Sequence, residues 1–89
     1  MPRPQRCRRI CSEPVCASFI PQEGSWSRTV CLSVDEFEVL RLVDYEKKTH
    51  EQCAAQMDIS RTTVTEIYES ARQKLADCLT SGTRLVITG

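Results

Sequence analysis

This 89-residue sequence has no proline in its second half and only three glycines along its whole length. Its prolines are Pro2, Pro4, Pro14 and Pro21. Proline breaks a helix in its interior, so its absence after Ser33 favours helices as far as about Thr80. Before Ser33 only short extended pieces are expected, at roughly 7–11, 17–20 and 29–32.

Long hydrophobic runs are also absent. No segment is apolar enough to span a membrane, and no signal-peptide core follows the N-terminus. We therefore expect a cytoplasmic protein without a membrane partner, whose six cysteines stay reduced and form no disulfide framework. Paired carboxylates, a nucleophile beside a base and a glycine-rich phosphate loop do not stand out, so no enzyme is expected.

The sequence has no net charge, since 12 Lys and Arg balance 12 Asp and Glu. This balance counts mildly against a nucleic-acid binder, but the charges are unevenly distributed. The first eleven residues carry only positive charge, at Arg3, Arg6, Arg8 and Arg9. An extended segment of nine residues reaches about 30 Å. It is expected either to follow a DNA backbone or minor groove as an arm or to be a frayed terminus.

Three helix starts are marked by capping residues. Ser33 with Glu36 forms the first capping box, and Thr49 with Gln52 repeats the pattern. Ser60 is the expected cap of a third helix, which Gly82 ends. The remainder, 83–89, predicts a short strand that must pair with an earlier extended piece or with another chain. We therefore divide the chain into three parts: an N-terminal arm with short extended segments at 1–32, a helix-turn-helix domain at 33–82 and a C-terminal strand at 83–89.

The break at Asp58 decides the predicted fold. Asp is tolerated where a turn needs a positive φ, and Ile59 is expected to point inward from that turn. Small Ala54 permits a close approach of the third helix, whose Val64 and Ile67 would pack on the second. Two helices joined by so short a turn predict a helix-turn-helix. The fold class is therefore mainly α, a three-helix helix-turn-helix core with an irregular N-terminal extension of short strands and a short C-terminal strand.

The third helix presents polar residues that suit a DNA major groove. Threonine hydroxyls bond phosphate oxygens or bases, Arg61 suits a phosphate or guanine, and Glu66 suits a cytosine amino group. Arg72 and Lys74 are placed to reach the backbone. The candidate DNA-binding residues are Ser60, Arg61, Thr62, Thr63, Thr65, Glu66, Glu69, Arg72 and Lys74. The alternative is a three-helix bundle with a solvated polar face.

Two resemblances bear on these residues. The stretch DISRTTVTEIYESARQKL, 58–75, resembles the last helix-turn-helix of bacterial sigma factors, which reads the promoter −35 element. The shared positions are Ile59, Ser60, Arg61, Val64, Ile67, Ala71, Lys74 and Leu75. The whole chain also resembles a family of small uncharacterised bacterial and archaeal proteins, predicted to bind DNA, that open with MPRP and CRR(I/V)C. These resemblances imply a sigma-like DNA-reading helix.

The cysteines fall into two groups. Cys53 and Cys78 lie on apolar helix faces and Cys31 lies in an apolar strand, so all three are expected to be small buried hydrophobes. Cys7, Cys11 and Cys16 lie in a basic segment, and with Cys31 or His50 as a fourth ligand they would hold zinc or an iron–sulfur cluster. Two other readings stay open: a redox sensor whose thiolate nearby arginines stabilise, and ordinary strand packing. For His50 there are two interpretations, a metal ligand or a solvated residue in the first turn of the second helix.

The resulting functional hypothesis is a sequence-specific DNA-binding transcriptional regulator, with no certain cofactor, that reads double-stranded DNA from about Arg61. A homodimer is expected because the core is thin and the terminal strand can pair across chains. The alternative hypothesis is a metal- or redox-responsive protein-interaction module that uses Cys7, Cys11 and Cys16 and whose helical part binds RNA polymerase or another protein.

Overall fold

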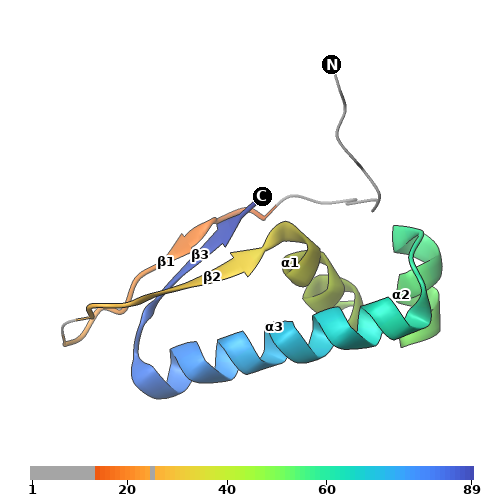
Figure 1. Ribbon diagram of the computed structural model, residues 1–89. Helices are drawn as coiled ribbons and strands as arrows, with labels where there is room; N and C mark the ends of the chain where they lie inside the picture. Colours follow the sequence, from red (N-terminus) through yellow and green to blue (C-terminus); the bar gives the residue numbers. More distant parts are fainter. Residues whose placement is uncertain (1–13, 25) are drawn as a thin grey trace.

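The computed structural model describes residues 14–24 and 26–89. Its elements are β1 (Ser18–Phe19), β2 (Thr29–Ser33), α1 (Val34–Leu40), the π-helical turn η1 (Arg41–Tyr45), α2 (His50–Met57), α3 (Arg61–Ser81) and β3 (Arg84–Thr88). A small sheet lies over the C-terminal half of α3, while α1 and α2 lie beside its N-terminal half (Figure 1). The chain is therefore mainly helical, with a three-stranded sheet. The strand expected at 7–11 lies outside the described residues.

The C-terminal strand pairs within its own chain. The sheet order is β1-β3-β2, so β3 lies in the middle. It runs antiparallel to β1, with Ser18 opposite Val86, and parallel to β2, with Cys31 opposite the same Val86. Of the two partners expected for this strand, the earlier extended piece is therefore the one observed. Pairing of β3 with a second chain, which was one reason to expect a dimer, is wrong because both of its edges are occupied.

The predicted helix starts are confirmed. Ser33 and Thr49 each accept a hydrogen bond from the backbone N–H three residues on, and both capping boxes are complete. The Ser60 hydroxyl accepts from the Thr63 N–H at 3.1 Å. At the far end Gly82 takes the left-handed conformation, with φ of 66°, and its N–H donates to the Cys78 carbonyl. Local capping chemistry thus sets the helix boundaries that the sequence predicts.

Two apolar clusters hold the elements together. One lies where α1, η1, α2 and α3 meet, and its buried members are Val39, Leu42, Cys53, Ala54, Met57 and Val64. The other joins the sheet to α3, and its buried members are Val30, Leu32, Ala71, Leu85 and Ile87. Both clusters share α3, so this helix is the common wall of the fold.

The apolar residues of α1 and η1 are buried to different degrees. Val39 and Leu42 are fully buried, whereas Phe37, Leu40 and Val43 are only partly buried. Phe37 and Leu40 pack against the cluster that joins the sheet to α3, whereas Val43 packs against the cluster between α2 and α3.

Two acids of the first helix are buried rather than solvated, Glu36 at 6% exposure and Glu38 at 0%. Both have charged partners, as buried carboxylates require.

The three cysteines that were expected to be buried differ in their exposure. Cys53 is fully buried, as expected, and Cys78 is half-buried with its thiol donating to the Thr83 carbonyl. Cys31 is exposed, so its prediction as a buried hydrophobe is wrong. In β2 only Val30 and Leu32 are buried, because alternate side chains of a strand point to opposite faces of the sheet.

Among the described residues, no helix combines the length and the apolar character needed to cross a membrane.

Candidate functional site

The turn between α2 and α3 has the geometry predicted from Asp58. Asp58 adopts a left-handed conformation, with φ of 63° and ψ of 45°, and its N–H donates to the Ala54 carbonyl. The Ile59 N–H donates to the same carbonyl at 3.1 Å, which closes the turn. Ile59 packs against the apolar cluster below, and Ser60 then caps α3. Three residues therefore suffice to redirect the chain.

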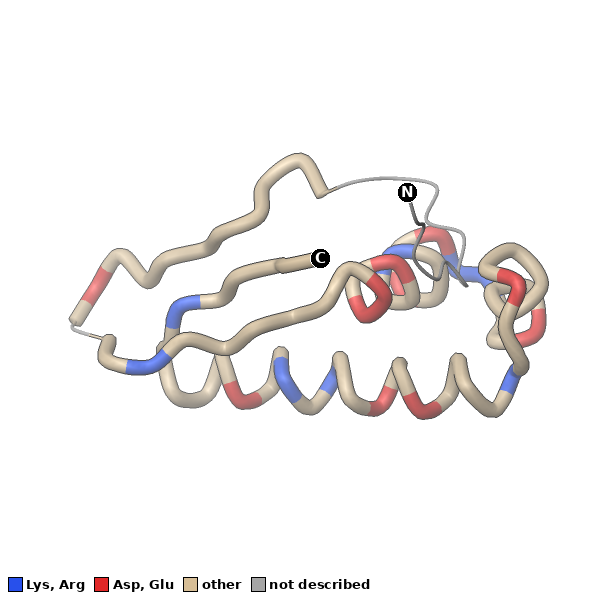
Figure 2. Tube along the Cα trace, turned by 45° about the horizontal axis from the view of Figure 1, so that its top comes forward, with Lys and Arg blue, Asp and Glu red and all other residues tan. Residues whose placement is uncertain are grey.

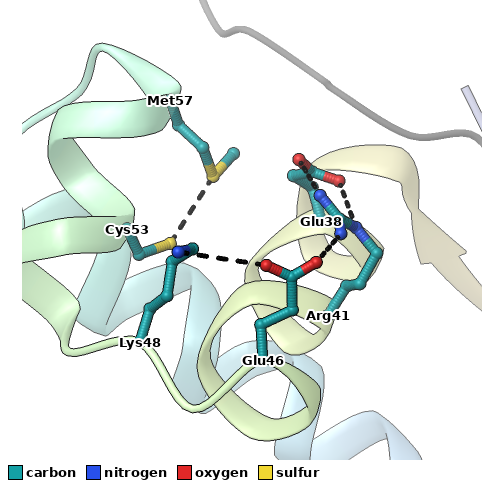
Figure 3. A network of polar contacts seen from close by, with 6 residues as sticks. All are labelled: Glu38, Arg41, Glu46, Lys48, Cys53 and Met57. Atoms are coloured by element: carbon teal, nitrogen blue, oxygen red, sulfur yellow. Dashed lines mark hydrogen bonds and ion pairs between the residues drawn. The ribbon is translucent and has the colours of Figure 1, made fainter.

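The two helices on either side of this turn are locked by buried side chains. Cys53 and Met57 of α2 and Val64 of α3 are fully buried, and Ala54 is nearly so. The Cys53 thiol lies 3.7 Å from the Met57 sulfur (Figure 3). Burial raises the pKa of the Cys53 thiol, with a further contribution from the charge of Glu38, so this cysteine stays a neutral packing group.

The N-terminal part of α3 packs on α2 with one face and exposes the other to solvent. Arg61, Thr62, Glu66 and Glu69 are all exposed. These side chains present one guanidinium, the hydroxyl and methyl groups of a threonine, and two carboxylates. An exposed helix end of this kind carries groups that bond phosphates and base edges.

The other predicted threonines have partners inside the protein. The Thr63 hydroxyl lies 2.8 Å from the Ser60 hydroxyl, so both belong to the cap of α3. The Thr65 hydroxyl lies 3.0 Å from His50 Nδ1, and the His50 ring meets the edge of Tyr68 with centroids 5.0 Å apart. The expectation that His50 is a solvated first-turn residue is therefore wrong. It is half-buried and links α2 to α3.

The two basic residues farther along α3 are paired with acids from the first helical region. Arg72 donates a hydrogen bond to Asp44 at 3.1 Å and another to the Tyr68 hydroxyl. The Arg72 guanidinium also lies over the Tyr68 ring. Lys74 donates to Glu36 at 2.9 Å. Tyr68 in turn donates to Asp44 at 2.9 Å. These contacts fix α3 against α1 and η1, and DNA would have to compete for the same cations.

A second polar network links α1, η1 and the loop before α2. Glu38 receives two hydrogen bonds from Arg41, one from Nε at 3.2 Å and one from the terminal nitrogen at 2.9 Å (Figure 3). Arg41 also pairs with Glu46, whose carboxylate lies 3.9 Å from the Lys48 ammonium. The hydrogen bond to Glu38 is the main cause that raises the pKa of Arg41. The network holds η1 and the loop before α2 in one arrangement.

Charges of both signs are interspersed along α3, as Figure 2 shows. After Arg61 come the acids Glu66 and Glu69, and only then Arg72 and Lys74. The exposed side of this helix is therefore not a uniformly basic stripe. Contacts made by individual residues, Arg61 above all, would carry more of any interaction with DNA than a general attraction to phosphate.

The described part of the chain does not assemble the predicted metal site. Within residues 14–24 and 26–89, no group of three or more His, Cys, Asp or Glu side chains is arranged to hold a metal ion. Cys16 lines a groove beside α1, whereas Cys31 is on the outer face of the sheet. Cys7 and Cys11 lie outside the described residues, as do Arg3, Arg6, Arg8 and Arg9. The metal, redox and DNA-arm readings stay predictions.

Sequence reasoning missed the group formed by Asp44, Tyr68 and Arg72. Its sequence signal was limited to Tyr68 and Arg72, which are four residues apart and so share one side of a helix. Asp44 is 28 residues from Arg72, and only the packing of η1 on α3 brings it near.

Comparison with known proteins gives matches along the whole chain. The family described as "Protein of unknown function DUF134" matches residues 1–89. A UPF0251 protein of Pelotomaculum thermopropionicum is 47% identical over 91 residues, which cover all of this chain and 69% of that protein. Another from Desulfitobacterium hafniense (strain Y51) is 43% identical, with 100% and 73% covered. A third, from Caldicellulosiruptor bescii, is 46% identical, with 100% and 63% covered. No solved structure matches the chain significantly.

Proposed function

Since this chain belongs to the DUF134 family of proteins of unknown function, we propose a function from the geometry of the site. We propose that the protein is a sequence-specific DNA-binding regulator of transcription. In this proposal α2, the turn at Asp58 and α3 form a helix-turn-helix. The N-terminal part of α3 enters the major groove, and α2 lies across the DNA backbone. The observation that supports this proposal best is the exposed face at the start of α3, which a tight and well-packed turn keeps in a fixed position.

The packing supports this orientation. Every residue that joins α2 to α3 in the apolar cluster is on the inner side of the pair, so the groups at Arg61, Thr62 and Glu66 remain accessible to a ligand. The bonds of Ser60 and His50 to the first turns of α3 hold this segment in one position. A preorganised helix loses little conformational entropy when it binds.

The chemistry of the exposed residues suggests their roles. Arg61 is the base-reading or phosphate-binding cation, because a guanidinium donates two parallel hydrogen bonds to guanine or phosphate. Thr62 offers a methyl group for thymine and a hydroxyl for phosphate, and Glu66 accepts from a cytosine amino group. Thr65, Arg72 and Lys74 are secondary, since each already has a partner in the protein.

The resemblance of 58–75 to the −35-reading part of sigma factors supports the same docking mode. It adds RNA polymerase as a candidate protein partner, because sigma factors act on promoters as part of that enzyme. The zero net charge predicts weak non-specific binding, so the affinity has to come from the contacts of individual residues on the exposed face of α3.

The decisive experiment is selection of bound sequences from a random double-stranded DNA pool, followed by fluorescence anisotropy on the enriched sequence at several salt concentrations. We expect a recurring motif, and we expect binding to the motif to be at least about 10³-fold tighter than binding to a scrambled duplex. The absence of any enriched motif, together with no binding at low salt by protein shown to be folded by circular dichroism, would refute the proposal.

A further inference from the structure

The exposed large hydrophobic side chains of the described residues are concentrated in one region. They are Val15, Phe19, Ile20, Tyr45 and Leu79. Leu79 is 82% exposed and Tyr45 is 80% exposed. All five line one of two adjoining hollows, although they come from distant parts of the chain. We call these five residues the apolar strip.

The larger hollow is an apolar groove of about 740 Å³ between α1, α3 and the inner face of the sheet. Its walls include Phe37, Leu40, Leu75, Leu85 and Ile87. The second hollow shares Leu75 and Leu85 with it and continues toward the C-terminal end of α3. An apolar groove flanked by several exposed large hydrophobic side chains is a candidate interaction site.

The groove borders an edge of the sheet with which no other strand of residues 14–24 and 26–89 pairs. β1 is the outermost strand on this side. The Ile87 N–H of β3 donates to the Ala17 carbonyl at 2.8 Å. Backbone groups of successive residues in an antiparallel strand point alternately to either side, so the N–H and carbonyl of Ser18 are directed away from β3. The Cys16 thiol, a weak donor, bonds that Ser18 carbonyl at 3.1 Å.

We propose that this edge and the apolar strip form the interface with a second copy of the chain. The two β1 strands pair antiparallel about a two-fold axis perpendicular to the sheet, with the outward backbone groups of Ser18 at its centre. Pro14 and Pro21 limit the paired segment to 15–20, because proline has no N–H to donate. The groove of each copy is then covered by Phe19 and its neighbours from the partner.

A second copy fits this surface for three reasons. A two-fold interface uses the same patch twice, so an apolar strip next to an open strand edge meets an identical strip and edge. A stable interface of standard size needs about 800 Å² per partner, which is about a seventh of the accessible surface of 5883 Å². The opposite edge strand, β2, exposes Thr29 and Cys31 instead of large apolar groups, so pairing there would not cover the strip.

The dimer deepens the proposed function. The axis relates two copies of α3 on the same side of the joined sheets, so a dimeric DNA binder would recognise an inverted repeat. This consequence rests on the proposed function, whereas the dimer itself does not.

The test is the molar mass in solution, measured by sedimentation equilibrium without DNA over a range of protein concentrations. We expect a mass that rises toward twice 10.1 kDa with concentration. Leu79→Asp places a charge in the strip, and Ser18→Pro removes the outward N–H but leaves the bonds of Ala17 to β3. Both variants are expected to be monomers. The matched control is Ala76→Asp, on the exposed side of α3 outside the strip, which is expected to remain a dimer.

Circular dichroism verifies that each variant is folded. A wild-type protein that stays monomeric up to its solubility limit overturns the proposal. A dimer that survives both Leu79→Asp and Ser18→Pro overturns it as well, because another surface then joins the copies. A monomer that binds a short β-forming peptide added in excess would assign the edge to a peptide partner instead. DNA binding is measured separately, so a failure of the dimer and a failure of the proposed function give different results.

Discussion

Glu36, at the start of α1, accepts a hydrogen bond at 2.9 Å from Lys74, which follows it by 38 residues. The Glu36 side chain is 8% exposed and that of Lys74 is 38% exposed. Ser70 donates to the other carboxylate oxygen at 2.6 Å, and the Ser33 N–H donates at 2.8 Å. One carboxylate thus caps α1 and also binds α3.

This carboxylate should make stability depend on acid pH. Burial on its own raises the pKa of Glu36, but the hydrogen bonds from Ser70, Ser33 and Lys74, with the charge of Lys74, outweigh it and lower the pKa below its ordinary 4.5. A lowered native pKa stabilises the fold above about pH 4.5, and this contribution is lost as the pH falls through the native value. Urea unfolding at a series of pH values should show a smaller loss of stability on acidification for Glu36→Gln than for the wild type.

At neutral pH, Glu36→Ala should lower the free energy of unfolding by about 2 kcal/mol, because Ser70 and Lys74 lose their acceptor. The matched control is Glu51→Ala, in the exposed first turn of α2, which should cost less than about 0.5 kcal/mol. Equal losses for the two variants would show that the long-range contact of Glu36 contributes nothing.

The hydroxyl of Tyr68 provides a test of the group that fixes α3 to η1. Its hydrogen bond to Asp44 is the main cause that raises the pKa of Tyr68 above its usual 10, and Arg72 opposes the shift. Asp44→Asn should therefore lower the pKa of Tyr68, and Arg72→Gln should raise it. Ultraviolet titration in a Tyr45→Phe background follows Tyr68 alone, because the chain has two tyrosines. Shifts of the same sign in both variants would contradict this arrangement.

The turn at Asp58 should discriminate between side chains by their backbone preferences. Its φ of 63° is strained for most residues and free of strain for glycine. Asp58→Val should destabilise the protein by about 1–2 kcal/mol, and Asp58→Gly should be at least as stable as the wild type. Thermal unfolding measures both, with exposed Ala55→Val in the neighbouring helix as a control for the branched side chain. A stable Asp58→Val variant would mean that the turn can adopt another conformation.

Arg61 should matter most for DNA binding if the proposed function holds. Arg61→Ala should weaken binding to the selected sequence by about 1–3 kcal/mol and relax the base preference at one position if it reads a guanine. If it binds only phosphate, the loss should be uniform across sequences, with a shallower salt dependence. The control is Arg28→Ala, which removes an equal charge near the opposite end of α3, where Arg28 pairs with Asp77 at 3.0 Å. An equal effect of both substitutions would indicate general electrostatics without a reading helix.

The outcome at particular residues shows why some features were predictable. Ser33, Thr49, Ser60, Asp58 and Gly82 act on backbone groups within a few residues, so their roles as caps and turn residues could be assigned from the sequence. The inward face of α2 and α3 was also recognisable, since apolar residues recur every three or four positions there.

Other residues depended on contacts that no local pattern encodes. Glu38 is fully buried although it is charged, and His50 contacts Thr65 only because the turn at Asp58 brings α2 onto α3. The exposure of Cys31 depends on which face of β2 the helices cover, because alternation alone leaves both faces equivalent.

Three helix starts, the stop at Gly82 and the sharp turn at Asp58 could be derived from the sequence, because they follow from backbone capping and from apolar spacing within one segment. Only the packed fold places β3 between β1 and β2, joins Glu36 to Lys74, and brings five exposed hydrophobic residues to two adjoining hollows. These arrangements join segments that are far apart in the chain, and their free energy arises from desolvation and complementary charge, which exist only once the segments have packed together.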